Sequence, residues 1–434
     1  MERVTDHLIV ISFDCLSSLD FHMLKELPNF KNLLSRSAFC KNVETIYPSV
    51  TYPCHATIVT GNFPNTHGIV NNTLLQPGVL SPDWYWHRKF ITGTTLYDEA
   101  RKAGLITAAL LWPVTAKAKI NYNMPEIFAN RLWHHQIAVS LWNGSPLYQL
   151  EMNRKHGHIR NGLSQPELDD FVVESTVSTI ISKKPNLLLV HLTDLDTQRH
   201  YHGFSSEEAK AALHRHDQRL GKITGAIKKA GLEDRATIVA LGDHSALDES
   251  KAIHPNVLLK EMGLLKVNNK GKVIDWKAYC KSCDGSAYIY IKNQKDKETK
   301  EMVVNLFEKL LKETKNGIEQ VFTNAHAKEK GADELAFLMI EARQGFYFKE
   351  CHDTSYIRSI TKEDVEERRY TYCSHGYSPA KEKYTTVFIA KGKGIRPDTE
   401  IASMHLVDEG PTFATLLGVN LGETDGRSVE EIII

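Results

Sequence analysis

The chain has 434 residues, with 53 Lys and Arg against 53 Asp and Glu, so its formal net charge is zero. This balance argues against a protein that bulk charge holds on a nucleic-acid polymer or a membrane surface. With 42% hydrophobic and 24% charged residues, the composition is that of a globular protein with a sizeable core, which excludes a disordered or collagen-like chain.

The start of the chain and its cysteines bear on the cellular compartment. From Met1 the sequence runs through mostly polar residues into an apolar run at Leu8, without the basic region and cleavage site of a signal peptide. No stretch approaches the roughly 20 apolar residues that span a bilayer. Seven scattered cysteines, an odd number, fit a reducing compartment better than a disulfide framework. We therefore expect a cytoplasmic protein of bacterial type with no membrane partner, unless a leader has been removed.

Buried, β-branched runs alternate with helical patterns along the chain. The predicted strands are Leu8–Phe13, Thr107–Trp112, Leu187–Leu192 and Thr237–Leu241, and Glu207–Ala230 is predicted to be an amphipathic helix. Such alternation is typical of an α/β fold in which helices sandwich a central, mainly parallel sheet. Sites in such sheets lie beyond the carboxyl ends of the strands.

Two segments do not follow this alternation of strand and helix patterns. Residues 256–351 contain Lys-rich stretches and predict an inserted α+β cap, so that 1–255 and 352–434 form the catalytic core. The expected elements of the cap are strands at Ala287–Ile291 and Leu335–Ile340 and a helix at Thr299–Lys312. A second segment, 74–158, carries five of the six tryptophans. It either lines one wall of a substrate cleft or packs as a small core of its own.

The segment from Tyr47 to Gly61 predicts a loop that turns into a short helix. Pro53 fits the first helical position and Gly61 a helix end. Thr51 then lies at or just before the helix N-terminus, where free backbone N–H groups favour an anion. A threonine there is by default only a cap, but its hydroxyl becomes a nucleophile if a bound divalent metal lowers its pKa.

Potential metal ligands gather after the predicted strands. Two of them, an aspartate and a histidine spaced i,i+4, share a face if their segment is helical. The set contains three carboxylates and three imidazoles: Asp14, Asp196, His200, Asp243, His244 and His375. These ligands suffice for two borderline-soft divalent ions with open positions, which favours zinc.

Five motifs in this order resemble the signatures of the nucleotide pyrophosphatase/phosphodiesterase (type I phosphodiesterase) branch of the alkaline phosphatase superfamily. They are Asp14 after the first strand, Thr51-Tyr52-Pro53-x-His55 with Val59-Thr60-Gly61 and Asn72, Asp196-x-x-x-His200-x-x-Gly203, Asp243-His244, and His375-Gly376-Tyr377. The similarity runs from residue 8 to about 425. It implies an alkaline-phosphatase-like α/β core with a small α+β cap insertion.

The resemblance also implies roles for individual residues and two Zn²⁺ per chain. One zinc would be held by Asp14, Thr51, Asp243 and His244, and the other by Asp196, His200 and His375. Thr51 would be the nucleophile, and Asn72 would donate a hydrogen bond to a phosphoryl oxygen. Tyr52, where the family usually has Phe, would stack on a nucleobase or cover the leaving side. The expected activity is hydrolysis of small nucleotide-like phosphodiesters through a covalent phospho-threonine.

Three residues depart from the family pattern, namely Cys54, Leu195 and Arg199, where the family usually has Asn, Pro and Gly. They bear on substrate preference. Arg199 is either a solvated or ion-paired surface arginine or a group that binds the extra charge of a monoester. The same signatures fit a phosphonoacetate-hydrolase-type C–P hydrolase or a phosphomonoesterase. A metal-stabilised binding protein without turnover is the alternative outside enzymes.

Several other residues have a structural and a functional interpretation. His191 and His202 are candidate substitutes among the metal ligands, but the spacing favours His200. We expect His55 and His67 to organise the nucleophile loop. Solvated or capping roles are expected for His214, His216 and Asp217, and structural ones for Cys280 and Cys283.

Overall fold

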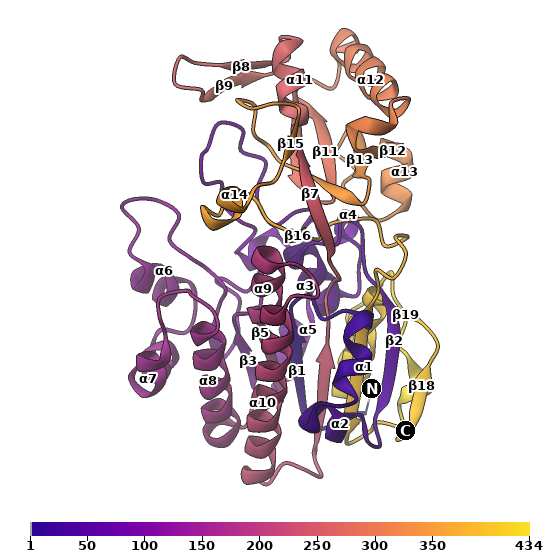
Figure 1. The fold of residues 1–434 in the computed structure, drawn as a ribbon. Helices are drawn as coiled ribbons and strands as arrows, with labels where there is room; N and C mark the ends of the chain where they lie inside the picture. The colour runs from indigo at the N-terminus through magenta and orange to yellow at the C-terminus, as the bar shows by residue number, and fades with distance from the viewer. Residues whose placement is uncertain (1) are drawn as a thin grey trace.

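The computed structural model describes residues 2–434 and contains a large sheet flanked by helices, with a smaller unit above it (Figure 1). The predicted strands are confirmed as β1 (His7–Phe13), β3 (Thr107–Leu110), β5 (Leu187–Leu192) and β6 (Ala236–Leu241). The strand order is β18-β2-β17-β6-β1-β5-β3-β4. β1 pairs in parallel with β5 and β6 at the centre, which confirms the α/β fold class.

One strand of the large sheet is reversed. β17 (Thr386–Gly392) lies between β6 and β2 (Ala38–Glu44) and is antiparallel to both. The strands β18 (Thr399–Ile401) and β19 (Met404–His405) pair in parallel with β2, and β4 (Tyr122–Met124) pairs in parallel with β3. The carboxyl ends of β1, β5 and β6 therefore meet at the edge of the sheet that faces the smaller unit.

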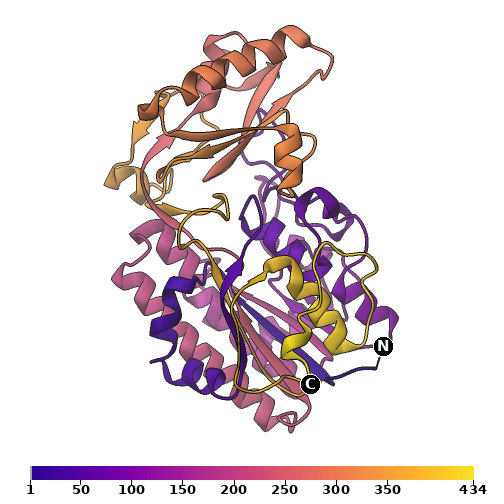
Figure 2. The same cartoon turned by 90° about the vertical axis from the view of Figure 1, so that its right-hand side faces the viewer.

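Helices cover both faces of this sheet because successive side chains of a strand point to opposite sides. Ile9 and Ile11 of β1 join a core with α2 (Pro28–Leu34), α8 (Glu167–Lys183) and α10 (Glu207–Lys229). Leu8 and Val10 join a second core with α3 (Thr51–Thr60), α5 (Leu96–Lys102) and α15 (Glu409–Leu417). Figure 2 shows α15, in yellow, over the face of the sheet turned toward the viewer.

The smaller unit is built on its own sheets. Its main sheet has the order β10-β11-β13-β12 and packs under α12 (Lys297–Leu311), as Figure 2 shows. Its strands are β10 (Ala278–Cys283), β11 (Ser286–Ile291), β12 (Ile318–Thr323) and β13 (Leu338–Ala342). A second sheet joins β7 (Leu247–Ile253), β14 (Gly345–Phe348), β15 (Ile357–Ser359) and β16 (Cys373–Ser374), and β8 (Leu265–Val267) pairs with β9 (Val273–Trp276). Residues 256–351 thus lie in this unit, together with the flanking strands β7, β15 and β16.

The segment 74–158 is divided between layers. Its strands β3 and β4 belong to the large sheet, whereas α6 (Gln136–Asn143) and α7 (Pro146–His156) lie at one side of the molecule (Figure 1). Trp84 and Trp86 pack with Tyr52 in a small apolar cluster, and Trp112 lies in the main core. Trp84 and Trp86 thus belong to a small separate cluster and Trp112 to the large core, while Trp133 and Trp142 are exposed.

The boundaries of some predicted elements differ. The strand Thr107–Trp112 ends at Leu110, because Leu111 adopts a left-handed φ of 52°. The strand predicted to begin at Leu335 begins at Leu338, and Leu335 is exposed. The remaining helices are α1 (Phe21–Leu24), α4 (Pro64–His67), α9 (Asp194–His202), α11 (Pro255–Glu261), α13 (Asn324–Glu329) and α14 (Lys362–Glu366).

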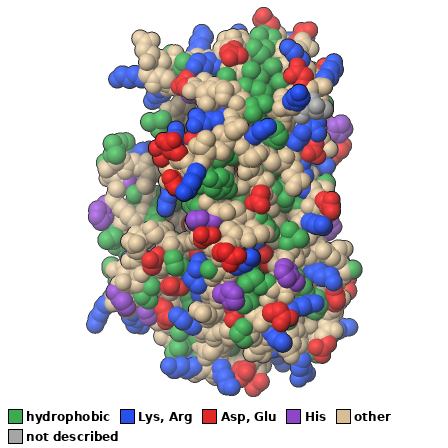
Figure 3. Space-filling model, in the orientation of Figure 1, with side chains coloured by type: hydrophobic (Ala, Val, Ile, Leu, Met, Phe, Trp, Pro, Cys, Tyr) green, Lys and Arg blue, Asp and Glu red, His purple; other side chains and the backbone are tan. Residues whose placement is uncertain are grey.

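The surface reflects the neutral net charge. Basic and acidic side chains are interspersed over the face seen in Figure 3. Across the described part of the chain, no helix combines the length and apolar character needed to cross a membrane.

Candidate metal centre

Thr51 is the first residue of α3, at the edge of the sheet where β1 and β6 end. Val50 precedes it in an extended conformation, and Gly61 ends the helix with a φ of 70°. Pro53 is the third helical residue rather than the first, which the helix tolerates because N–H groups of the first turn have no intrahelical partner. The Thr51 hydroxyl lies 3.3 Å from Nε2 of His244.

Four residues form what we call the core set: Asp14, Thr51, Asp243 and His244. Asp14 directly follows β1, and Asp243 and His244 follow the neighbouring strand β6, so the parallel pairing brings them together. Nε2 of His244 lies 3.3 Å from Asp14 Oδ1 and 3.2 Å from Asp243 Oδ2. The side chains of Asp243 and His244 are completely buried.

Three residues form the α9 set: Asp196, His200 and His375. Asp196 and His200 share a face of α9, as the spacing predicts, and Asp196 Oδ2 lies 3.2 Å from His200 Nε2. His375 follows β16 of the smaller unit, and its Nε2 lies 3.8 Å from Asp196 Oδ1. The His375 ring stacks on His244 with centroids 3.9 Å apart, so the two sets adjoin.

The sets differ in their electrostatics. Burial raises the pKa of Asp14 well above its usual value, and the nearby Asp243 and Asp196 carboxylates add to this shift. Burial also raises the pKa of Asp243 to about 6 and lowers that of His244 to about 4. In the α9 set burial opposes the charge on His200, but the Asp196 carboxylate raises its pKa to about 9. The pKa of Asp196 is correspondingly lowered, against its own burial.

The residues present fit a pair of divalent metal ions. Asp14 Oδ1, Asp196 Oδ1 and Asp243 Oδ2 are buried and accept no hydrogen bond from any residue that the structure describes. Buried polar atoms are normally paired, so these oxygens are arranged for a partner other than protein. Within Asp14, Asp243 and His244, and within Asp196, His200 and His375, candidate ligand atoms lie within 4.8 Å of one another. Mixed carboxylate and imidazole donors suit zinc.

Buried histidines hold these ligands in place. His191 is not in either set, and its Nε2 lies 3.1 Å behind Asp14, at Oδ2. His55 bridges the Thr51 carbonyl, at 2.8 Å, and the Ser12 hydroxyl, at 3.0 Å. His67 lies 3.0 Å from the Thr57 hydroxyl of α3. Such contacts fix the orientation of metal ligands and of the loop that carries them.

The two predicted substrate residues occupy different positions. Asn72 Oδ1 accepts a hydrogen bond from the Tyr52 backbone N–H at 2.8 Å, and its Nδ2 makes no hydrogen bond to residues 2–434. The Tyr52 side chain is fully buried and packs edge-on against Trp84, with centroids 5.1 Å apart. In this structure the Tyr52 ring therefore presents no open face to a nucleobase.

Arg199 is ion-paired but is not at the surface. Its side chain is 2% exposed, its Nη2 lies 2.6 Å from Asp20 Oδ1, and its guanidinium stacks 3.7 Å from the Phe204 ring centroid. It also donates to the Cys15 carbonyl. The surface position that the sequence suggests is therefore wrong, because Asp20 and the Cys15 carbonyl enclose the guanidinium.

The remaining candidates lie away from the metal ligands or serve the fold. His202 is exposed and faces Glu208 at 3.8 Å. Asp217 caps α2 by accepting the N–H groups of Asn29 and Phe30, whereas His216 is buried against Phe13 rather than solvated. His214 is exposed, and Cys280 and Cys283 are free and buried.

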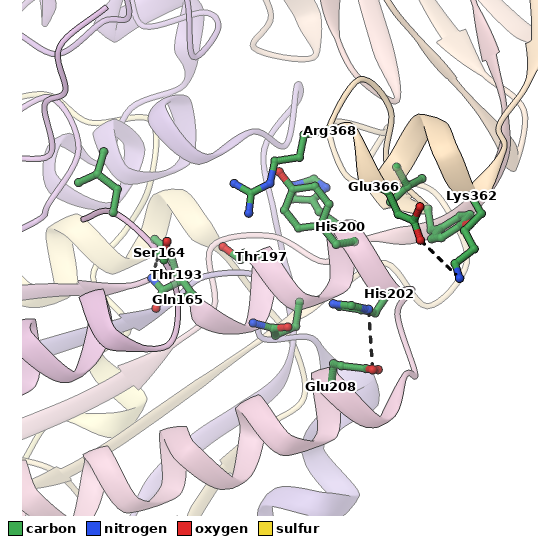
Figure 4. Close-up of a pocket in the computed structure, with 15 residues that line it drawn as sticks. Ser164, Gln165, Thr193, Thr197, His200, His202, Glu208, Lys362, Glu366 and Arg368 are labelled. Atoms are coloured by element: carbon green, nitrogen blue, oxygen red, sulfur yellow. Dashed lines mark hydrogen bonds and ion pairs between the residues drawn. The ribbon is translucent and has the colours of Figure 1, made fainter. Parts of the chain in front are cut away.

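A cavity of about 830 Å³ opens beside the α9 set (Figure 4). His200, Thr197 and Tyr201 line it from α9, and Arg368 and Lys362 line it from the smaller unit. Figure 4 shows Lys362 paired with Glu366, and His202 with Glu208. Arg368 lies over the Tyr201 ring, 5.2 Å from its centroid, and forms no ion pair within residues 2–434. The cavity is large enough for a drug-sized or nucleotide-sized group.

Two residues near the site are absent from the sequence-based set. Glu126 Oε2 lies 3.3 Å from Nδ1 of His191, and its position just after β4 is the signal that would have revealed it. Cys15 lies within 4.8 Å of candidate ligand atoms of Asp196 and His244. Its position directly after Asp14 in the sequence is the feature that could have revealed it.

Comparison with known proteins identifies the family of this α/β chain. Residues 8–378 match the family described as type I phosphodiesterase/nucleotide pyrophosphatase. The chain belongs to this family, and the predicted resemblance is confirmed.

Curated relatives are longer proteins. Human ectonucleotide pyrophosphatase/phosphodiesterase family member 1 is 24% identical over 254 residues, which are 56% of this chain and 24% of that protein. Venom phosphodiesterase 2 of Crotalus adamanteus is 25% identical over 223 residues, 50% of this chain and 24% of that protein. The matched region thus spans about a quarter of the length of these relatives.

Solved structures share the fold over the whole chain. The murine ectonucleotide pyrophosphatase/phosphodiesterase 5, solved as an inactive variant in complex with AMP, aligns with a TM-score of 0.68 and 19% identity. The alignment covers 99% of this chain and 100% of that one. The human protein 5 aligns with a TM-score of 0.67 and 20% identity.

Proposed function

We propose that this protein is a two-zinc phosphodiesterase/nucleotide pyrophosphatase that acts on small, nucleotide-like diesters. The observation that carries the proposal is the convergence of the core set and the α9 set beside the hydroxyl of Thr51, with three buried carboxylate oxygens that accept no hydrogen bond from residues 2–434. Membership of the type I phosphodiesterase/nucleotide pyrophosphatase family supports the reaction class.

The core set and the α9 set are the residues that hold the metal ions in this proposal. Zinc bound there supplies charge neutralisation at phosphorus and lowers the pKa of a coordinated hydroxyl. The protein contributes the position of that hydroxyl. Thr51 is fixed at the start of α3, and His55 anchors its carbonyl.

Thr51 Oγ1 is the nucleophile. Its attack forms an O–P bond while the bond to the leaving oxygen breaks and the hydroxyl proton passes to solvent, which gives a covalent phospho-Thr51 that carries the remaining substituent. Water then cleaves the Thr51–phosphorus linkage and regenerates the hydroxyl. Asn72 donates from Nδ2 to a phosphoryl oxygen, because its Oδ1 is already engaged by the Tyr52 N–H.

The surroundings favour a diester over a monoester. Arg199, the one basic residue beside a proposed ligand in the sequence, is buried and already engaged by Asp20 and by the Cys15 carbonyl. The cavity beside His200 offers room for the second substituent that distinguishes a diester.

A side-by-side assay of the zinc-loaded protein tests this proposal. We expect kcat/KM for p-nitrophenyl thymidine 5′-monophosphate to exceed that for p-nitrophenyl phosphate by about tenfold or more, a difference of about 1.4 kcal/mol. Preference for the monoester would identify a phosphomonoesterase. Phosphate release from phosphonoacetate alone would identify a C–P hydrolase, and absence of turnover on all three would favour a binding protein.

A further inference from the structure

Cys15 is held in a strained backbone conformation between the two ligand sets. It directly follows Asp14, and its φ of 65° lies in the left-handed region that a side chain bearing a Cβ rarely adopts. Its N–H donates to Asp243 Oδ1 at 3.1 Å. The backbone of Cys15 is therefore fixed by a member of the core set.

The sulfur of Cys15 is directed at the junction of the sets. Sγ, one carboxylate oxygen of Asp196 and one ring nitrogen of His244 all lie within 4.8 Å of one another. Asp196 belongs to the α9 set and His244 to the core set. Cys15 is completely buried, and the buried Asp243 Oδ2, which also faces His244 Nε2 at 3.2 Å, has no hydrogen-bond partner.

Sγ lies against a fixed cation as well as against the two sets. Nη1 of Arg199 lies 3.7 Å from Sγ, and Asp20 fixes this guanidinium from the other side. Burial, together with the Asp196 and Asp14 carboxylates, raises the pKa of the Cys15 thiol well above its usual value against the effect of Arg199, so the thiolate forms only when a metal ion replaces the thiol proton. Thiolate is also a softer donor than carboxylate or imidazole and favours zinc over magnesium or manganese.

We propose that Cys15 is an additional metal ligand, a thiolate at the junction of the two sets, in a site otherwise built from oxygen and nitrogen donors. The inference rests on the proposed two-metal site. On binding, a metal–sulfur bond replaces the S–H bond and the thiol proton is released to water. The consequence is a centre that selects thiophilic divalent ions.

Cobalt(II) absorption tests this ligand without an assay of turnover. The parent protein carries Cys351→Ser, because Cys351 is the exposed cysteine and could bind cobalt at the surface. Cobalt-loaded parent is expected to show visible d–d bands and, in addition, a sulfur-to-cobalt charge-transfer band in the near ultraviolet. In Cys15→Gly the charge-transfer band disappears while the d–d bands remain. Glycine suits the φ of this position, so the variant is expected to fold.

Cys373→Ser is the matched control, because Cys373 is buried in the same small cluster as Cys15. It keeps the charge-transfer band. Competition titrations give a second readout: Cys15→Gly weakens Zn²⁺ binding by about tenfold or more, since even groups outside the first ligand shell contribute that much, and changes Mn²⁺ binding less.

The outcomes separate this inference from the proposed function. Visible d–d bands without a charge-transfer band in the parent overturn the Cys15 ligand and leave the two-metal site intact. A charge-transfer band that survives in Cys15→Gly also overturns it. Failure of the parent to bind cobalt or zinc overturns both.

Discussion

The two ligand sets are assembled in different ways although they share one site. In the core set, Asp14, Asp243 and His244 come from the ends of adjacent parallel strands and are 0–4% exposed, and Thr51 joins them from the start of α3. The α9 set joins one helix to a segment that follows β16 of the smaller unit, and its His200 side chain is 21% exposed at the cavity. The core set is thus fixed by sheet pairing, whereas the α9 set depends on how the smaller unit packs on the sheet.

The ionised side chains of the two sets affect the stability of the metal-free protein in opposite directions. In the core set, carboxylates are buried near one another, so Asp243 is destabilised when ionised. In the α9 set, His200 faces Asp196, and the pair stabilises both charges. We infer that the core set is costly to the metal-free fold and that the α9 set supports it. The experiments below test this contrast.

Thr51→Ala should have the largest effect. Loss of the nucleophile is expected to lower kcat/KM by about 10³-fold or more, as for other covalent catalysts, while zinc content measured by mass spectrometry stays near that of the parent. Thr60→Ala is the control, because Thr60 lies at the other end of the same helix, where its hydroxyl donates to the Ala56 carbonyl and accepts from the Asn62 N–H. Retained turnover in Thr51→Ala would contradict the assigned nucleophile.

Asp243→Asn and Asp196→Asn should change the stability of the metal-free protein in opposite directions. The pKa of Asp243 is raised from 3.8 to about 6, so its ionised form costs up to about 3 kcal/mol above pH 6. Asp243→Asn should therefore raise the free energy of unfolding at pH 8 in chelator, and this gain should fade as the pH drops from 6 toward 3.8. The Asn side chain can still accept the Cys15 N–H.

Asp196→Asn should destabilise the metal-free protein at pH 8. The pKa of Asp196 is lowered in the fold, so its contribution is present above its unfolded pKa and is lost as the pH falls through the folded value. Denaturant unfolding at several pH values measures both variants, with the exposed Asp234→Asn as control. If both substitutions raised, or both lowered, the free energy of unfolding, the proposed contrast between the sets would be contradicted. Zinc should then stabilise the parent more than either variant.

Arg368→Ala should act only on substrates with an additional anionic group. The Arg368 side chain lines the cavity without an ion-pair partner, and an exposed charge contact is worth about 0.2–1 kcal/mol, or up to about fivefold in KM. We expect KM for ATP to rise by that factor and KM for p-nitrophenyl thymidine 5′-monophosphate to stay constant. Arg369→Ala, whose side chain is paired with Glu367 and Asp364, should change neither.

Tyr52→Phe should have the smallest effect. Because the ring is buried against Trp84, removal of its hydroxyl should leave KM for the thymidine diester within about twofold, the spread of near-neutral contacts. A large increase in KM would show that the ring moves to contact substrate.

Much of the core could be predicted because its signals are local. The apolar run Leu187–Val190 predicts a buried strand, and the predicted strand Leu187–Leu192 is β5 with the same bounds. The i,i+4 spacing of Asp196 and His200 indicates a shared helix face, and α9 confirms it. The position of Thr51 at a helix start follows from Pro53 and Gly61, although the helix begins two residues before Pro53.

Other features depend on contacts between distant segments. Nothing near Arg199 in the sequence indicates that Asp20 and the Cys15 carbonyl would bury it. Tyr52 belongs to the nucleophile motif, but Trp84 and Trp86 from another segment enclose its ring. Likewise, His191 faces Asp14 because β5 pairs with β1, and Glu126 reaches His191 because β4 and β3 pair on the other side of β5.

The elements of the core and the residue types of the metal centre could be predicted from the sequence, because hydrophobic periodicity and the order of the motifs are properties of the chain itself. Only the three-dimensional packing shows that His375 of the smaller unit stacks on His244, that Asp20 buries Arg199, and that Cys15 faces both sets. The physical reason is that these contacts join segments far apart in sequence. Their geometry follows from strand pairing and from the packing of the smaller unit on the sheet, which no local pattern encodes.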